Sequence, residues 1–339
     1  MNELMIETKG LTKKFGDFTA VDHIDLKVEQ GTIHGFIGPN GAGKTTTMKM
    51  LIGALRPTSG TGFIKGEKIG SLESRKIFGY SPEHPHFYED MTAFDYLVYV
   101  GRVSGMDRKT SESRSLELLN FFELKKFAYK KIKGFSAGMK QRLSLAQSMI
   151  HEPELLILDE PTANLDPEGR ITIIRKLKEL CKKEGITVFI SSHILSELEK
   201  MVDFVTILNH GQIVAESDIQ TLEKKFSGKV YLLKTSKNRE VLNKLKSHDL
   251  VKHAWIDDKD VIHIIAKGDE KEFKKNVTKI ILESDTTLES FTMETSDLET
   301  VFMKLVGKGE KRENIEMKKE PVLSKLFKRK HEKEAEEKI

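Results

Sequence analysis

One stretch of the sequence combines residue types that can hold the phosphates of a nucleotide. Residues 38–45 fit the pattern G-x-x-x-x-G-K-[ST], in which glycines let backbone N–H groups close around phosphates. The Lys44 ammonium can reach the β- and γ-phosphates, and the Thr45 hydroxyl can bind Mg²⁺. A strand pattern precedes the loop and a helical pattern follows it, so a chance glycine loop is a poor explanation. The residues expected to bind the nucleotide here are Gly38, Asn40, Gly41, Ala42, Gly43, Lys44, Thr45 and Thr46.

A pair of carboxylates follows a second apolar run. Residues 155–158 are Leu-Leu-Ile-Leu, as expected of a strand that is covered on both faces, and Asp159 and Glu160 come next. Ligands of open α/β sheets bind at the carboxyl ends of strands, so Asp159 can hold Mg²⁺ and Glu160 can polarise the water that attacks the γ-phosphate. A solvated turn is the alternative for two such acids alone, and the phosphate loop makes it the weaker one. Together the two motifs predict a P-loop nucleotidase.

A third motif narrows the class of nucleotidase. Residues 135–142 read Phe-Ser-Ala-Gly-Met-Lys-Gln-Arg and begin a helical pattern shortly before the acidic strand. Ser136 is a natural N-cap, and the start of a helix offers free N–H groups and a positive dipole to an anion. An ordinary capped helix is the alternative, but at this distance from Asp159 the motif resembles the signature of ABC-type ATPases. Three of its five positions depart from that family's Leu-Ser-Gly-Gly-Gln, whereas Ser136 and Gly138, which carry the phosphate contact, are present.

The resemblance extends over residues from about 4 to 220 and implies further roles. Phe15 takes the place of the aromatic that stacks on adenine, Asp166 lies in the loop that bridges two nucleotide sites, and His193 matches the switch histidine. An ordinary buried phenylalanine and a surface histidine are the plain alternatives for Phe15 and His193. Glu83 stands where the family carries a glutamine that contacts Mg²⁺, and its carboxylate can still bind the ion but adds a negative charge. The resemblance thus implies catalytic roles for Lys44, Glu160 and His193, and Mg²⁺ contacts for Thr45, Glu83 and Asp159.

The order of the patterns predicts an α/β fold in two domains. Residues 1–222 are expected to form a P-loop NTPase core of ABC type, with an antiparallel β subdomain and a helical subdomain at about 84–140. The pattern β-α-β-β-α-β over 228–306 is that of a split βαβ, or ferredoxin-like, accessory domain. In the charged tail, 307–339, a basic amphipathic segment could weakly contact an anionic membrane surface. The simpler alternative is a disordered, solvated segment of charged residues.

Three local expectations concern single elements. The alternation of Ile24, Leu26 and Val28 with polar residues predicts one strand with a wet face. The helix after the phosphate loop is expected to continue until Arg56, which precedes a proline. Trp255 is expected in the core of the accessory domain.

Composition excludes several classes of protein. The 339 residues with 38% hydrophobic content are enough for about two domains with cores. The 56 Lys/Arg against 52 Asp/Glu leave a formal net charge of +4, so no footprint for nucleic acid appears and no such partner is expected. The single cysteine forbids an internal disulfide, and neither a secretory signal nor an apolar span of membrane length occurs. We therefore expect a cytoplasmic chain.

A single ATPase core followed by an α+β unit resembles the ATP-binding subunits of ABC-2-type exporters. In this family the phosphate loop of one subunit and the signature helix of another enclose the same ATP, which implies a homodimer or a heterodimer with a second ABC ATPase. The resemblance also implies a multi-span permease, docked near residues 83–99, and a peripheral place on the cytoplasmic face of the cell membrane. Two alternatives stay open: a soluble ABC ATPase that acts on ribosomes or nucleic acid, and an ATP-binding regulator that does not hydrolyse ATP.

Overall fold

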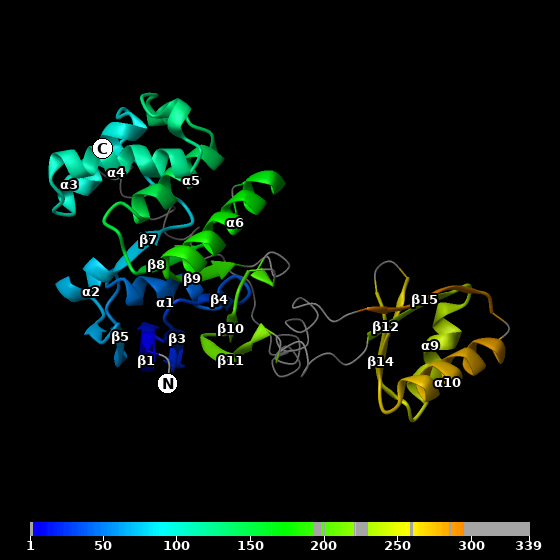
Figure 1. Ribbon diagram of the computed structural model, residues 1–339. Helices are drawn as coiled ribbons and strands as arrows, with labels where there is room; N and C mark the ends of the chain where they lie inside the picture. Colours follow the sequence, from blue (N-terminus) through cyan, green and yellow to red (C-terminus); the bar gives the residue numbers. More distant parts are fainter. Residues whose placement is uncertain are drawn as a thin grey trace, which may run out of the picture. The chain divides into compact units, whose positions relative to one another are not determined.

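The computed structural model contains a long α/β part and a smaller α+β unit (Figure 1). The described residues are 3–163, 165–192, 198–199, 201–219, 221, 230–257, 260–284 and 286–294. His193 and the charged tail lie outside these residues.

An antiparallel sheet forms from the N-terminal residues and from the segment that follows the first helix. Its strand order is β2-β1-β5-β6, with β3 also paired to β1. The bounds are β1 (Leu4–Phe15), β2 (Phe18–Ile24), β3 (Lys27–Glu29), β5 (Ser59–Ile64) and β6 (Glu67–Lys68). The prediction of one continuous strand over 24–28 is wrong, because the Thr8 hydroxyl interrupts the pairing. It donates to the Ile24 carbonyl at 2.8 Å and accepts the Leu26 N–H at 2.9 Å, so β2 ends and β3 begins there.

The second sheet carries the carboxyl ends on which the predicted site depends. Its order is β11-β10-β4-β9-β8-β7, and all neighbours are parallel except β10 and β11. The bounds are β4 (Ile33–Ile37), β7 (Phe78–Ser81), β8 (Leu155–Asp159), β9 (Thr187–Ser192), β10 (Phe204–Asn209) and β11 (Gln212–Asp218). Every residue of β4, β8 and β9 is buried, and for β8 the apolar run over 155–158 predicted this.

The helix that follows the phosphate loop is shorter than predicted. It spans α1 (Lys44–Leu51) and does not reach Arg56. The chain turns at Gly53, whose φ of 73° is a conformation that side chains disfavour, and this ends the helix. Two further helices of this part are α2 (Leu72–Ile77) and α6 (Pro167–Glu184).

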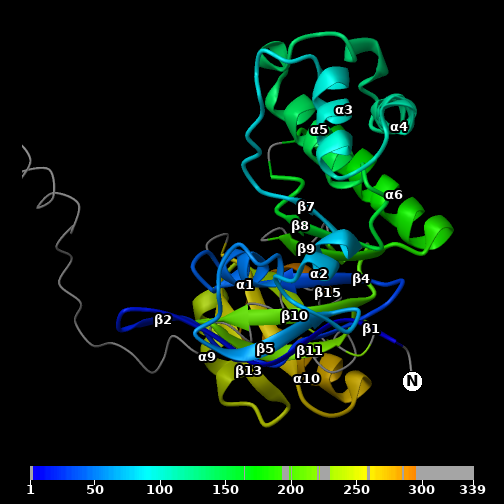
Figure 2. The same ribbon diagram turned by 90° about the vertical axis from the view of Figure 1, so that its left-hand side faces the viewer.

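A group of helices is inserted between β7 and β8, as predicted. The bounds are α3 (Ala93–Val103), α4 (Arg108–Phe121), η1 (Lys125–Phe127), η2 (Ile132–Gly134) and α5 (Ala137–Ser148). Figures 1 and 2 show α3, α4 and α5 gathered at one end of the α/β part, with β1 and β5 at the other. Thr92, Asp107 and Ser136 cap the three helices with their side-chain oxygens. Among the residues that the structure describes, no helix is both long and apolar enough to cross a membrane.

The smaller unit follows the predicted order of elements. Its bounds are β12 (Val230–Thr235), α9 (Asn238–Lys246), β13 (Val251–Ile256), β14 (Ile262–Ala266), α10 (Glu270–Leu282) and β15 (Leu288–Glu294). The sheet is antiparallel, with the order β13-β14-β12-β15, and its core includes Tyr231 and Phe273 with ring centroids 4.6 Å apart. The prediction of a core position for Trp255 is wrong. A register shift after Val251 puts Trp255 on the face opposite to the buried Ala254, where its ring stacks on His263 at 5.0 Å.

Candidate functional site

The two predicted motifs meet at one edge of the parallel sheet. The phosphate loop follows β4, the acidic pair ends β8, and Glu83 comes two residues after β7. These strands lie in the order β4-β9-β8-β7 and run in the same direction, so their carboxyl ends are neighbours. The charges of Glu160, Asp159 and Glu83 all act on the Lys44 ammonium. The structure therefore brings together four of the predicted site residues from three separate stretches of sequence.

Two glycines of the loop cannot be replaced without moving the backbone. A Cβ on Gly38 would lie 2.5 Å from the Leu208 carbonyl oxygen, and a Cβ on Gly43 would lie 2.5 Å from the Ala20 carbonyl oxygen. Gly43 also has a φ of 104°, which L-residues rarely adopt. The loop is thus held tightly against β2 and β10, and α1 begins directly after it at Lys44. This places the N–H groups of the first helical turn at the sheet edge, where an anion can bind them.

Lys44 is turned back onto its own loop. Its ammonium donates to the carbonyl oxygens of Gly38 at 2.7 Å and Pro39 at 3.3 Å, and the side chain is buried. Burial lowers the pKa of Lys44, while the negative charges of Glu160, Asp159 and Glu83 oppose that shift. A buried ammonium that is held only by neutral carbonyl oxygens gains from a phosphate oxygen, because the opposite charge adds a Coulomb attraction that a neutral carbonyl does not supply.

The acidic pair is oriented by a serine of the neighbouring strand. The Ser191 hydroxyl donates to Asp159 Oδ1 at 2.6 Å and accepts the N–H of Glu160 at 3.0 Å. Glu160 is 6% exposed and has a φ of 48°, in the left-handed region where non-glycine residues are strained. One hydroxyl thus fixes both acidic residues. Sequence reasoning missed Ser191, because only the register of β8 with β9, which pairs Asp159 with Ser191, reveals its role.

Two residues of β7 extend the site beyond the sequence prediction. Burial, helped by the negative charge of Asp159, raises the pKa of Tyr80 to about 12, so its phenol stays protonated beside the carboxylate. The Ser81 hydroxyl shares a hydrogen bond of 2.8 Å with the Ser144 hydroxyl, which joins the strand before Glu83 to α5. Glu83 itself is half-buried, with His84 Nε2 at 3.6 Å from its carboxylate. The only sequence signal for Tyr80 was its place in a strand that ends near Glu83.

The signature motif has the local geometry that its residues predict. The Ser136 hydroxyl accepts the N–H of Met139 at 3.2 Å and is exposed at the start of α5. Asp166 is also exposed, and it caps α6 by accepting the N–H of Gly169 at 3.2 Å. Within the described residues, no hydrogen bond or ion pair joins Ser136 or Asp166 to Lys44 or the acidic pair. Exposed oxygens at the start of α5 and α6 are thus what these two residues offer, without a direct bond to Lys44 or the acidic pair among the described residues.

The structure describes Phe15 but not His193, the two residues for which the sequence left a plain alternative open. Phe15 ends β1 and is 49% exposed, so the alternative of an ordinary buried phenylalanine is wrong. The Lys13 ammonium lies 5.1 Å from the centroid of its ring. His193 lies outside the described residues, so its predicted role is not addressed by the structure.

Comparisons with known proteins show which family this chain resembles. The sequence profile described as ABC transporter matches residues 21–163. The bacitracin transport ATP-binding protein BcrA of Bacillus licheniformis is 38% identical over 308 residues, which cover 90% of this chain and 98% of that protein. The lantibiotic transport ATP-binding protein SrtF of Streptococcus pyogenes is 40% identical over 229 residues, which cover 67% of this chain and 97% of that protein.

Solved structures agree with the sequence comparisons. An ATP-binding subunit of an ABC transporter is 30% identical, with a TM-score of 0.60, and covers 66% of this chain and 93% of its own. An ATP-binding cassette solved as a dimer in a post-hydrolysis state, bound to ADP and Pi, is 25% identical with a TM-score of 0.59 and covers 63% of this chain and 99% of its own. The chain belongs to the family of ABC transporter ATP-binding proteins, as a subunit that binds and hydrolyses ATP to drive transport.

Proposed function

We propose that this chain is the ATPase subunit of an exporter and that the residues at the carboxyl edge of the parallel sheet hydrolyse ATP. The observation that carries the proposal is the convergence of Lys44, Asp159, Glu160 and Glu83 at that edge. A lysine at the start of a helix can bind phosphate, and carboxylates beside it can hold a metal and activate water. The two motifs found in the sequence therefore form one reaction centre.

The donor atoms of the site fit Mg²⁺. Thr45 supplies a hydroxyl and Asp159 and Glu83 supply carboxylates, and Mg²⁺ prefers such oxygen ligands together with phosphate oxygens. When bound, the ion neutralises charge on the phosphates. Lys44 would exchange the Gly38 and Pro39 carbonyls for phosphate oxygens. Glu160 would accept a proton from the attacking water, and Ser191 would hold its backbone in place.

A second subunit would complete the nucleotide site. Ser136 and Asp166 are exposed, and Gly138 is half-exposed beside Ser136. Two copies related by a two-fold axis could each offer the start of α5 to the other's phosphate loop. Phe15, exposed at the end of β1, would stack on the adenine. We thus expect ATP to bind between two subunits, either identical or homologous.

The partner in the membrane would dock on the aromatic surface that follows Glu83. Tyr88 and Tyr99 are 61% and 44% exposed, their rings are 5.7 Å apart, and Val103 on the same helix is 70% exposed. Aromatic residues are enriched at protein interfaces, and a multi-span permease is the partner that the family implies. The chain would then sit on the cytoplasmic face of the cell membrane.

The transported substrate is proposed from the relatives. BcrA is named for bacitracin transport and SrtF for lantibiotic transport, and BcrA aligns over nearly the whole chain. We therefore assign export of antibiotic peptides as the function, rather than work on ribosomes or nucleic acid. The unit from Val230 to Glu294 would be a ferredoxin-like accessory domain, which its strand order β13-β14-β12-β15 with two helices supports. Domain limits near 222, 228 and 306 are part of this proposal.

Copurification and antibiotic sensitivity would test the function together. Tagged Glu160→Gln chain is expressed in the native host, trapped with Mg-ATP and purified from gently solubilised membranes. A multi-span permease is expected to copurify by mass spectrometry, and Lys44→Ala, which cannot hold the phosphates, should retain less of it. A strain that lacks the gene should become more sensitive to bacitracin or a lantibiotic, with rescue by wild type but not by Glu160→Gln. Ribosomal or DNA-associated proteins alone would contradict the proposal.

A further inference from the structure

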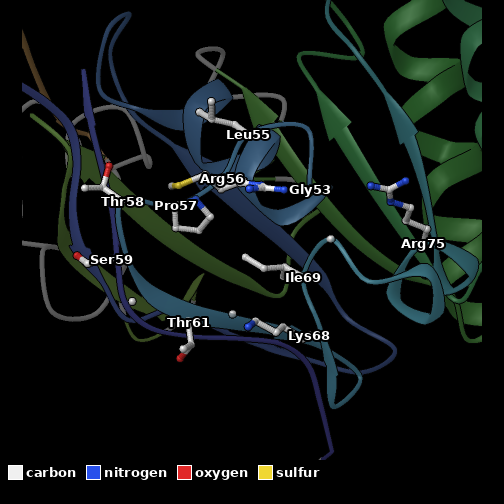
Figure 3. Close-up of a pocket in the computed structure, with 14 residues that line it drawn as sticks. Gly53, Leu55, Arg56, Pro57, Thr58, Ser59, Thr61, Lys68, Ile69 and Arg75 are labelled. Atoms are coloured by element: carbon white, nitrogen blue, oxygen red, sulfur yellow. The ribbon is translucent and has the colours of Figure 1, made fainter. Parts of the chain in front are cut away.

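A cavity lies at the far end of α1 from the phosphate loop. It has a volume of about 490 Å³ and opens between the turn after α1, strands β5 and β6, and the start of α2 (Figure 3). Cavities of 300–1,000 Å³ are typical of small-molecule sites. The residues that line it are Met50, Gly53, Leu55, Arg56, Pro57, Thr58, Ser59, Gly60, Thr61, Gly62, Lys68, Ile69, Gly70 and Arg75. Because α1 rises over eight residues, roughly 12 Å separate this cavity from the start of the helix.

The charged residues of the lining all have the same sign. Arg56 follows α1, Lys68 ends β6 and Arg75 belongs to α2, so the positive charges of the lining come from three elements. Figure 3 shows Arg75 set apart from Arg56 and Lys68. No lining residue is acidic. The Lys13 ammonium donates to the Arg56 carbonyl oxygen at 2.8 Å and adds a further positive charge next to the lining. The cavity is therefore a concentrated positive site on a chain whose formal net charge is only +4.

These cations differ from their paired neighbours. Lys76, on the same helix as Arg75, bonds Glu73 at 2.9 Å, and Lys65, in the turn before β6, pairs with Glu154. Across the ranges that the structure describes, neither arginine nor Lys68 of the lining has a carboxylate within 4.0 Å. A single arginine near the C-terminus of α1 could serve the helix dipole. Lys68 and Arg75 belong to other elements, so the dipole does not account for the presence of all three cations in the lining.

We propose that this cavity binds a phosphate-bearing ligand, at a site separate from the ATP site. Two guanidinium groups offer planar forks that match phosphate oxygens, and Lys68 adds a point charge. Thr58, Ser59 and Thr61 line the same cavity with hydroxyl groups that can donate to a phosphate. Its apolar residues, such as Leu55 and Ile69, suit a ligand that carries an apolar group beside the phosphate.

The phosphate could come from a small soluble molecule or from a lipid headgroup, and the test separates the two. The full-length protein is first saturated with Mg²⁺ and a non-hydrolysable ATP analogue, so that the ATP site is filled. Inorganic pyrophosphate is then titrated by calorimetry, and vesicles of phosphatidylcholine with or without phosphatidylglycerol are tested by cosedimentation. The variants are Arg56→Gln and Arg75→Gln, and Lys76→Gln is the matched control because it lies beside Arg75 but outside the lining.

The outcomes assign the ligand or overturn the site. Binding of one pyrophosphate per chain, weakened about tenfold by either arginine variant and unchanged by Lys76→Gln, supports a soluble phosphate ligand. Cosedimentation with phosphatidylglycerol vesicles alone, lost in the same two variants, supports a lipid headgroup. Binding of neither probe, or equal loss in the control, overturns the proposal. All three residues are exposed, so the variants should fold, and unchanged ATPase rates would confirm that they do.

Discussion

We expect His34 to make the stability of the α/β part depend on pH. It lies in the middle of the parallel sheet on β4, is 1% exposed, and its Nε2 is 2.8 Å from the Thr206 hydroxyl. Phe189 and Phe204 flank the ring, with centroids 5.8 and 6.4 Å away. Burial lowers the pKa of His34 from 6.5 to about 4, because the charged imidazolium would lose its hydration there.

The sign of the effect follows from which state binds the proton first. In the unfolded chain His34 has its ordinary pKa of 6.5, so it binds a proton as the pH falls below that value. In the folded chain its pKa is about 4, so it stays neutral until the pH is near 4. The stability from this residue is therefore complete above pH 7.5 and is lost as the pH falls from 6.5 towards 4. Between pH 7.5 and 5.0 the loss is about 2 kcal/mol of unfolding free energy.

The perturbation is His34→Asn, which keeps a polar side chain near Thr206 but does not titrate. Urea unfolding is followed by far-UV circular dichroism at pH 7.5, 6.0 and 5.0. The variant should be less stable at pH 7.5, because the packed ring is gone, but it should lose about 2 kcal/mol less than wild type on going to pH 5.0. Trp255 is the only tryptophan and lies in the smaller unit, so its fluorescence provides a transition that the substitution should not shift. Equal losses with pH in both proteins would refute the assignment to His34.

Three further predictions concern the site and its support. Ser191→Ala removes the hydroxyl that holds Asp159 and Glu160, so kcat for phosphate release should fall about tenfold with nucleotide binding retained, and a wild-type kcat would contradict this. Glu160→Gln should slow steady-state hydrolysis at least about 10²-fold while fluorescent ATP still binds, whereas Lys44→Ala should lose both. Gly79→Ala would put a Cβ 1.8 Å from the Ser148 carbonyl oxygen, so the urea midpoint should drop by the equivalent of about 3 kcal/mol, and an unchanged midpoint would show that the two segments separate easily.

Motifs confined to a few neighbouring residues were predictable from the sequence. The phosphate loop, the buried strand before Asp159 and the N-cap at Ser136 depend on local spacing, and the structure has all three. Local spacing does not reveal partners that strand register brings from far along the chain. Ser191 reaches Asp159 across 32 residues. A register shift in β13 likewise reversed the face of Trp255, because one extra residue exchanges the two sides of a strand.

The contacts of α5 connect the proposed docking surface to the signature motif. The hydroxyls of Ser81 and Ser144 share a buried hydrogen bond of 2.8 Å, and the Tyr96 hydroxyl donates to Gln147 Oε1 at 2.7 Å. Tyr96 also packs edge-on against Phe87, with ring centroids 5.2 Å apart. The segment after Glu83 therefore contacts Tyr96, which is hydrogen-bonded to Gln147 of α5. Packed interiors transmit displacement because they leave little free volume. A permease that pushed on this segment would therefore move α5 as a unit, together with the Ser136 end that the proposal assigns to the second subunit's ATP.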